Sequence, residues 1–269
     1  MNSKVIVLHE EIQKWKDKLE AYQEQLAELI FQKDFLVFHV CKNIESKYLL
    51  KFGGLELKIY RLECEILHKK RKLELIQKQI NRQESVNLES IEQSLEMEFL
   101  TYQKELEKMM ENMEKAIERQ NNKILSKEEA KEIKKIYYEI AKELHPDLHP
   151  NMSKQKIRLF QQAILCYKNA DLLSLQAIAS ILEKNESRKE EKPFQTMKKE
   201  VERLEKLIKE FQEKIAEIKE DYPYCVKDLL ENAEKSEQYL LELQEQLKQM
   251  QDLDDEYKQM IVEKIRSLQ

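Results

Sequence analysis

Three consecutive residues, His145, Pro146 and Asp147, have types and spacing that suit a specific interaction. The proline ring fixes its own φ, so the loop that carries Asp147 has little conformational entropy left to lose on binding. A carboxylate held in this way can accept a bidentate arginine from a partner molecule. His145, at the end of the preceding segment, can orient the loop. The triplet therefore predicts a stiff loop outside the core that presents the Asp147 carboxylate.

Amphipathic helices are expected to hold this triplet between them. Ser126 and Glu129 form a capping box that begins the first helix. The prolines at 146 and 150 cannot continue a helix, so the chain must turn there. A second helix follows, and a third begins after Asp171, a suitable N-cap. The apolar stripes of the first two helices are Ile133, Ile136, Tyr137, Ile140, Ala141 and Leu144, and then Ile157, Phe160, Ile164 and Tyr167.

Residues 126–170 resemble the J-domain (DnaJ-like) co-chaperones. The similarity includes a tyrosine eight residues before the histidine, an alanine four residues before it, and a phenylalanine and tyrosine seven apart in the next helix. The resemblance implies no catalytic residue. It implies docking on a DnaK-type heat-shock ATPase, whose ATP hydrolysis is thereby accelerated. The partner-binding residues so implied are His145, Pro146, Asp147, Lys134, Lys135 and Tyr138.

The chain also departs from this family. The family's first helix is absent, and we expect Met113, Ile117 and Ile124, from the helix before Ser126, to cover the same apolar face. The family's second helix is usually basic, whereas residues 127–144 contain five Lys and five Glu. Tyr138 and Glu139 stand where Lys or Arg is usual. Without a Gly/Phe-rich linker or a zinc module, client binding would depend on coiled coils.

Composition restricts the fold to an all-α class. Only two of the 269 residues are glycine, too few for the turns of a β-sandwich or a phosphate-binding loop. Charged residues make up 37% of the chain, yet the net charge is −5, so no nucleic-acid footprint is indicated. No apolar run is long enough to cross a membrane, and no secretory signal is apparent. We therefore expect a cytoplasmic protein with free cysteines at 41, 64, 166 and 225.

Heptad patterns predict long antiparallel coiled-coil helices on both sides of the J-like segment. We expect an N-terminal coiled coil over 1–125, in which a helical hairpin turning at Gly53-Gly54 is followed by a third helix at about 88–124. The J-like domain spans 126–184, a charged linker 185–195, and a second helical hairpin 196–269. The apolar stripe broadens over 30–40, which indicates more than one packing partner there. The first seam comprises Val5, Leu8, Ile12, Trp15, Leu19, Tyr22, Leu26 and Leu29.

A metal site is weighed and not predicted. If the chain reverses at Gly53-Gly54, His39 faces His68, with Cys64 one turn away, which gives three ligands of the kinds that zinc prefers. Buried histidines and thiols in a helix pair are the commoner outcome. Cys166 is expected to be a core residue. We predict no metal, no cofactor and no enzymatic activity of the chain's own.

Two functions remain open. The first is a co-chaperone that docks on a DnaK-type ATPase through the triplet, with coiled coils for a client or partner. The second is a coiled-coil scaffold whose J-like domain no longer stimulates a chaperone. A simple helix stop at Pro146, with His145 favoured by the helix dipole, is the plain alternative for the triplet itself.

Overall fold

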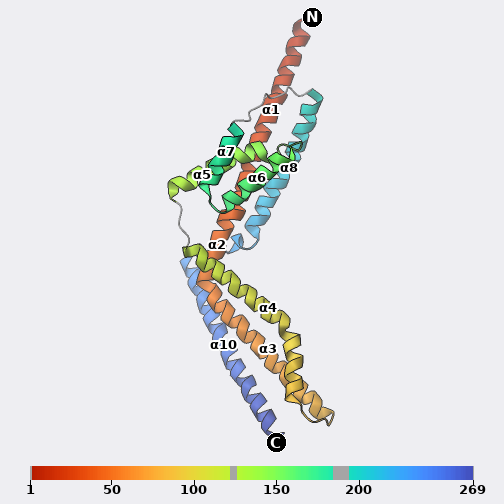
Figure 1. Ribbon diagram of the computed structural model, residues 1–269, viewed down its shortest axis with the longest axis vertical. Coiled ribbons are helices and arrows are strands. Elements are labelled where there is room, and N and C mark those ends of the chain that lie inside the picture. The colour runs from red at the N-terminus through yellow and green to blue at the C-terminus, as the bar shows by residue number, and fades with distance from the viewer. Residues whose placement is uncertain (1, 122–125, 184–193, 269) are drawn as a thin grey trace. The chain divides into compact units, whose positions relative to one another are not determined.

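A computed structural model describes residues 2–121, 126–183 and 194–268. Over these ranges the secondary structure is helical, with no strand, so the predicted all-α class is confirmed. None of the described helices is long and apolar enough to span a membrane. The elements in chain order are α1 (Asn2–Phe35), the π-helix η1 (Leu36–Val40), α2 (Cys41–Tyr48), the π-helix η2 (Leu49–Gly53), α3 (Gly54–Asn81), α4 (Leu88–Asn121), α5 (Lys127–Leu144), α6 (Lys154–Lys168), α7 (Leu172–Glu183), α8 (Phe194–Glu220), the 3₁₀-helix η3 (Tyr224–Val226), α9 (Lys227–Glu231) and α10 (Ala233–Arg266) (Figure 1).

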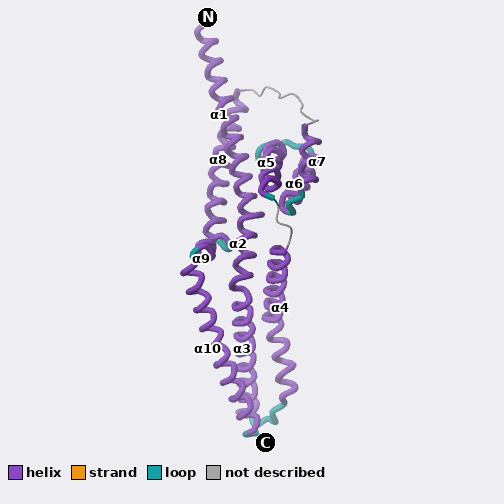
Figure 2. The backbone as a smooth tube through the Cα atoms, turned by 90° about the vertical axis from the view of Figure 1, so that its left-hand side faces the viewer, coloured by secondary structure: helices purple, strands orange, loops and turns teal. Residues whose placement is uncertain are grey.

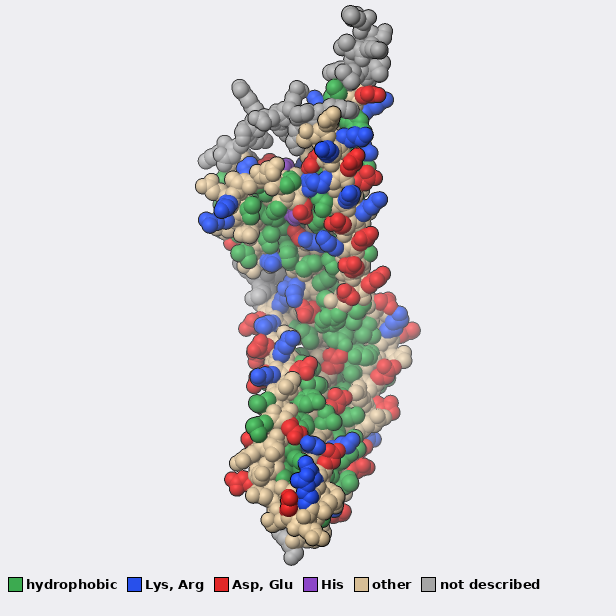
Figure 3. All heavy atoms as spheres, turned by 90° about the vertical axis from the view of Figure 1, so that its right-hand side faces the viewer, with side chains coloured by type: hydrophobic (Ala, Val, Ile, Leu, Met, Phe, Trp, Pro, Cys, Tyr) green, Lys and Arg blue, Asp and Glu red, His purple; other side chains and the backbone are tan. Residues whose placement is uncertain are grey.

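The chain divides into two compact units, each built from two separate stretches of sequence. The first unit contains Met1–Lys42 and Lys123–Cys225, and the second contains Asn43–Asn122 and Val226–Gln269. Side chains of both charge signs are interspersed on the face drawn in Figure 3, in keeping with the small net charge. Each unit therefore depends on pairing between helices that are distant in sequence.

In the first unit, α8 lies along α1, and α5, α6 and α7 pack on one another beside α1 (Figure 1). Local signals begin two of these short helices as predicted. Ser126 and Glu129 form a reciprocal capping box at α5, and Asp171 Oδ1 accepts the Ser174 amide at the start of α7. Most of the predicted apolar stripe of α5 and α6 is buried in one cluster. Its buried members are Ile133, Tyr137, Ile140, Ala141, Leu144, Phe160, Ala163, Tyr167, Leu175, Ile178 and Leu182.

In the second unit, α3 packs against both α4 and α10 (Figure 2). The α3–α4 reversal spans residues 82–87, where Gln83 has a φ of 57°. Asn87 caps α4 by accepting the Ser90 amide, and Val86 packs against the buried cluster of Ile76, Ile91 and Leu95. The real helical hairpin of the N-terminal half is therefore α3–α4, at a turn that contains neither glycine nor proline.

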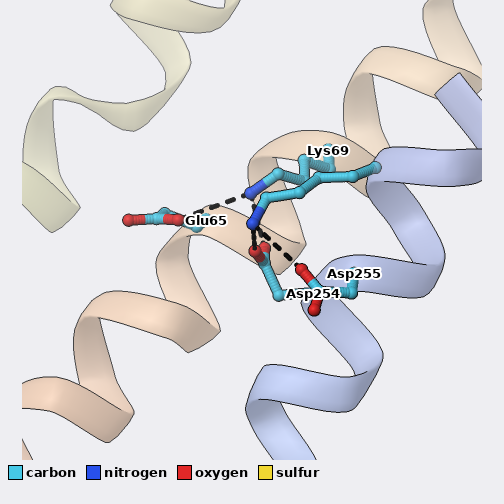
Figure 4. A network of polar contacts seen from close by, with 5 residues as sticks. Glu65, Lys69, Asp254 and Asp255 are labelled. Carbon is cyan, nitrogen blue, oxygen red and sulfur yellow. Dashed lines mark hydrogen bonds and ion pairs between the residues drawn. The ribbon is translucent and has the colours of Figure 1, made fainter. Parts of the chain in front are cut away.

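A buried carboxylate ties α10 to α3. Asp254 is 2% exposed and lies 2.5 Å from Lys69 Nζ and 2.7 Å from Lys258 Nζ. Glu65 and Asp255 extend this network at either side (Figure 4). Burial pushes the pKa of Asp254 upward, but the hydrogen bonds from the two lysines outweigh it and hold that pKa below its usual range. The ionised carboxylate thus favours one register of α10 on α3.

The predicted turn at Gly53-Gly54 is absent. Both glycines have right-handed helical dihedrals, with φ values of −56° and −66°, and the chain passes helically from η2 into α3. A Cβ on Gly53 would lie 2.9 Å from Met113 Sδ of α4. Gly53 therefore permits close packing of α4 and not a chain reversal.

Gly54→Ala should raise the free energy of unfolding by about 0.5–1 kcal/mol, because alanine is the better helix former and the site has room. The nearest atom to the new Cβ is Met113 Cε at 3.9 Å. Thermal unfolding followed by circular dichroism measures this. Gly53→Ala is the matched control and should gain less, because its Cβ meets Met113. A clear decrease in the free energy of unfolding of Gly54→Ala would instead indicate that the chain turns at this glycine.

The expected C-terminal hairpin over 196–269 is also replaced by a different pairing. α8 packs along α1 in the first unit, and α10 packs along α3 in the second. Most of the apolar heptad positions expected in this segment are nevertheless buried in α8, whereas Ile218 is only half-buried. The buried positions are Met197, Val201, Leu204, Ile208, Phe211 and Ile215. The sequence pattern identified the buried face of α8 but not the helix that covers it.

Candidate functional site

The His145-Pro146-Asp147 triplet lies in the loop between α5 and α6. His145 ends α5 by donating its amide to Ala141 O, and its extended backbone, with ψ of 128°, is the conformation favoured before proline. The Leu148 and His149 amides return to His145 O at 3.0 Å each. These bonds make the loop a compact turn.

The loop is partly buried, although the sequence predicted it to lie outside the core. His145 is 9% exposed, and its ring meets the rings of Phe160 and Phe211 edge-on, with centroids 5.2 and 6.3 Å away. Leu148 is buried in a cluster with residues of α1 and α8, namely Leu26, Ala27, Ile30, Leu204, Ile208 and Phe211. The burial of Leu148 holds the loop against these two helices. Because the His145 ring is also buried, His145 contributes to the stability of the fold as well as to the loop.

Pro146 and Asp147 remain accessible. Pro146 is exposed, and 44% of the Asp147 side chain is exposed. The Asp147 amide donates to His145 Nδ1 at 3.1 Å, and the Asp147 carboxylate lies 3.8 Å from the same nitrogen. His145 therefore braces the loop from beneath, and the Asp147 carboxylate is left available to a partner.

Burial also sets the charge state of His145. Desolvation lowers the pKa of His145, against the attraction of the Asp147 and Asp34 carboxylates. An imidazole that accepts the Asp147 amide at Nδ1 is neutral, with its proton on Nε2. The loop geometry and the lowered pKa thus favour the same neutral form.

Acidification should therefore destabilise the first unit through His145. Because its pKa is lower in the folded chain, the unfolded state binds the proton more readily, so stability falls as the pH drops below the ordinary value of about 6.5. One such proton contributes at most about 1.4 kcal/mol per pH unit. Urea unfolding followed by Trp15 fluorescence at pH 7.5 and 5.5 measures the loss. His145→Gln should show a smaller loss; equal losses would contradict this assignment.

Helix α1 contacts the polar side of α5. Lys134 Nζ lies 3.9 Å above the ring centroid of Phe35, and the Tyr138 ring meets Phe31 edge-on. The Tyr138 hydroxyl donates to Glu24, which also forms an ion pair with Lys142. Of the residues implied by the resemblance, Lys134 and Tyr138 are thus engaged by α1, His145 is buried, and Lys135, Pro146 and Asp147 face solvent or are half-exposed.

A buried carboxylate of α1 joins α5 and α6. Asp34 is 4% exposed and accepts the Tyr137 hydroxyl at 2.6 Å. The Tyr137 ring stacks on Tyr167 of α6, with centroids 3.9 Å apart and planes 3° from parallel. Burial, together with the nearby Asp34, raises the pKa of Tyr137, so its hydroxyl remains a proton donor. Only the broad stripe over 30–40 signalled this involvement of α1 in advance.

The helix that covers the α5–α6 core differs from the predicted one. Phe31 of α1 and Phe38 of η1 pack against this core. Of the residues expected there, Met113 contacts the Gly53 position in the second unit, Ile117 is 44% exposed, and Ile124 lies outside the described residues. The aromatic residues of α1 and η1 supply the apolar surface that was expected from the helix before Ser126.

The possible zinc ligands do not form a site. The helical passage through Gly53-Gly54 removes the reversal that would have brought His39, Cys64 and His68 together. Among the described residues, no group of three or more His, Cys, Asp or Glu side chains could hold a metal ion. Cys166, expected in the core, is only partly buried and packs against the α5–α6 core from its edge.

The triplet brings polar groups of different kinds together. It offers a half-exposed carboxylate on a braced turn, a neutral buried imidazole, and cationic and phenolic groups along α5. Comparisons of the chain with protein-family models, with curated proteins and with solved structures find no match.

Proposed function

We propose that this protein is a J-domain-like co-chaperone that docks on a DnaK-type heat-shock ATPase and accelerates ATP hydrolysis there. One observation carries the proposal: a His-Pro-Asp turn joins two packed helices, and its Asp147 carboxylate is braced yet accessible. A carboxylate presented in this way suits a bidentate arginine on the ATPase. The chain itself performs no chemistry; it supplies a rigid anion that the partner binds.

The test is single-turnover ATP hydrolysis by a DnaK-type chaperone with the full chain added. The wild type should accelerate hydrolysis, and Asp147→Asn, which removes the charge from a half-exposed side chain, should return the rate to the basal value. Asp221→Asn is the matched control, because Asp221 is an exposed residue of a different loop. Equal acceleration by both variants would refute docking through Asp147.

A scaffold is the second candidate, and a separate observation favours it. Lys134 and Tyr138, which would belong to the docking surface, are already engaged by α1. In a pure scaffold these contacts would be permanent, and the J-like helices would only stabilise the fold. The scaffold predicts no acceleration of ATP hydrolysis by the wild type at any concentration of the chain.

A further inference from the structure

Three side chains spaced four residues apart form one stripe on α5: Lys134, Tyr138 and Lys142, hereafter the docking stripe. Residues at this spacing lie on one side of a helix. Each of the three contacts α1: Lys134 lies over Phe35, and Tyr138 and Lys142 share Glu24. A single helix of the same unit therefore occupies the stripe along two turns of α5.

The surface of α1 at this contact is acidic. Glu20, Glu24 and Glu28, hereafter the acidic row, are also spaced four residues apart. The hydrogen bond to Glu24 raises the pKa of Lys142, with Glu20 adding to the attraction. The hydrogen bonds from Lys142 and Tyr138 lower the pKa of Glu24 in return. The acidic row is thus electrostatically complementary to the docking stripe.

The contacts are partly solvated, unlike the apolar seam on the other side of α1. The side chains of Lys142 and Glu24 are 43% and 51% exposed. Exposed ion pairs contribute little stability, so a partner can replace them at small cost. Leu26, Ala27 and Ile30 are fully buried in the cluster that α1 shares with α8. The contacts of α1 with the docking stripe can therefore break while its apolar side stays packed against α8.

We propose that α1 is a built-in competitor for the docking stripe. A chaperone surface that complements Lys134 and Lys142 must be acidic, as the acidic row is. It would therefore take the place of the acidic row and Phe35, and the chaperone must displace them to engage Tyr138 and Lys142. This inference rests on the proposed function. The protein is then a gated co-chaperone: Asp147 is accessible at all times, and the stripe becomes available only when the α1 contact opens.

The test compares Glu24→Lys with Asp17→Lys in the full chain. Both place the same charge change on α1, but Asp17 is hydrogen-bonded by Gln13 of α1 itself. Acetylation of Lys142, measured by mass spectrometry relative to the exposed Lys135, reports opening of the contact. Surface plasmon resonance reports the Kd for a DnaK-type chaperone. Glu24→Lys should speed Lys142 acetylation and tighten Kd by about two- to fivefold, the range for losing one exposed pair.

Phe35→Ala is a second variant, because it removes the ring beneath Lys134 and Phe35 is not part of the buried clusters. It should speed Lys134 acetylation and tighten Kd to a similar degree. Asp17→Lys should change neither quantity.

The possible outcomes separate the two proposals. If a variant opens the contact but binds the chaperone no better than Asp17→Lys, α1 is not a competitor, and the proposed function stands. If neither Glu24→Lys nor Phe35→Ala changes acetylation, α1 does not occlude the stripe, and the inference is wrong. If the chaperone binds neither the wild type nor the opened variants, the proposed function is wrong, and so is the inference that α1 competes for the docking stripe.

Discussion

Phe160→Ala should lower the free energy of unfolding of the first unit by about 3–5 kcal/mol, the usual cost of emptying a buried phenylalanine site. Phe160 is 4% exposed, lies in the α5–α6 core, and meets the His145 ring at 5.2 Å. The truncation removes apolar contacts of α6 with the α5–α6 core and with the His145 ring. Urea unfolding of the full chain, followed by the fluorescence of Trp15 in α1, measures the effect.

Leu165→Ala on the same helix is the matched control. Leu165 is 57% exposed, so its truncation should change stability by about 0.5 kcal/mol or less. A loss below about 1 kcal/mol for Phe160→Ala would mean that α5 and α6 do not pack as the structure has them. A comparable loss for Leu165→Ala would indicate that a partner covers the exposed side of α6.

Local structure was largely predictable from sequence, because its causes lie within a few residues. The apolar stripe that begins at Ile133 is largely buried, and the helix starts at Ser126 and after Asp171 follow their capping side chains. The break between the second and third helices was predicted, since the third helix was expected from about residue 88 and α4 begins at Leu88. The antiparallel pairing of α3 with α4 across the turn at 82–87 was not predicted, because that turn contains neither glycine nor proline. The prediction of a turn at Gly53-Gly54 was wrong because Gly53 is needed for a tertiary contact and not for a turn. It makes room for Met113 of α4, and this contact cannot be inferred from the neighbouring sequence.

The candidate site was predictable only in its local part. The triplet and its place between two helices follow from Pro146 and the flanking stripes. The engagement of Lys134 and Tyr138 by α1 did not follow, because Glu24 and Phe35 lie more than 90 residues earlier in the chain. Charged residues along one side of a helix are expected to face solvent unless the helix that packs against them is known. The burial of His145 depended in the same way on Phe211 of α8.

The choice of partner helix was the least predictable feature. A heptad seam specifies which side of a helix is apolar, and any other seam of suitable length satisfies it. Closing a longer loop adds little entropic cost, since each doubling of its length costs only about 0.6 kcal/mol. Pairing of α8 with the distant α1 is therefore not disfavoured relative to a local hairpin with α10. Side-chain packing, which periodicity does not encode, decides between them.

A double-mutant cycle on Leu26 of α1 and Leu204 of α8 tests this pairing. Both side chains are fully buried in the same cluster. Each alanine substitution alone should lower the free energy of unfolding by about 2–5 kcal/mol. Because the two sites share one cluster, the double variant should deviate from additivity by about 0.5–3 kcal/mol. Urea unfolding followed by Trp15 fluorescence and by circular dichroism measures both terms.

The control pair is Leu204 with Leu243 of α10. A hairpin turning at residues 221–225 would place these two leucines nearly opposite each other, whereas the structure assigns them to different clusters and different units. Their effects should therefore add to within about 0.5 kcal/mol. Coupling between Leu204 and Leu243, with additivity between Leu26 and Leu204, would show that α8 pairs with α10 in a C-terminal hairpin and not with α1. It would also mean that α8 does not cover the apolar side of α1 where Leu26, Ala27 and Ile30 are buried.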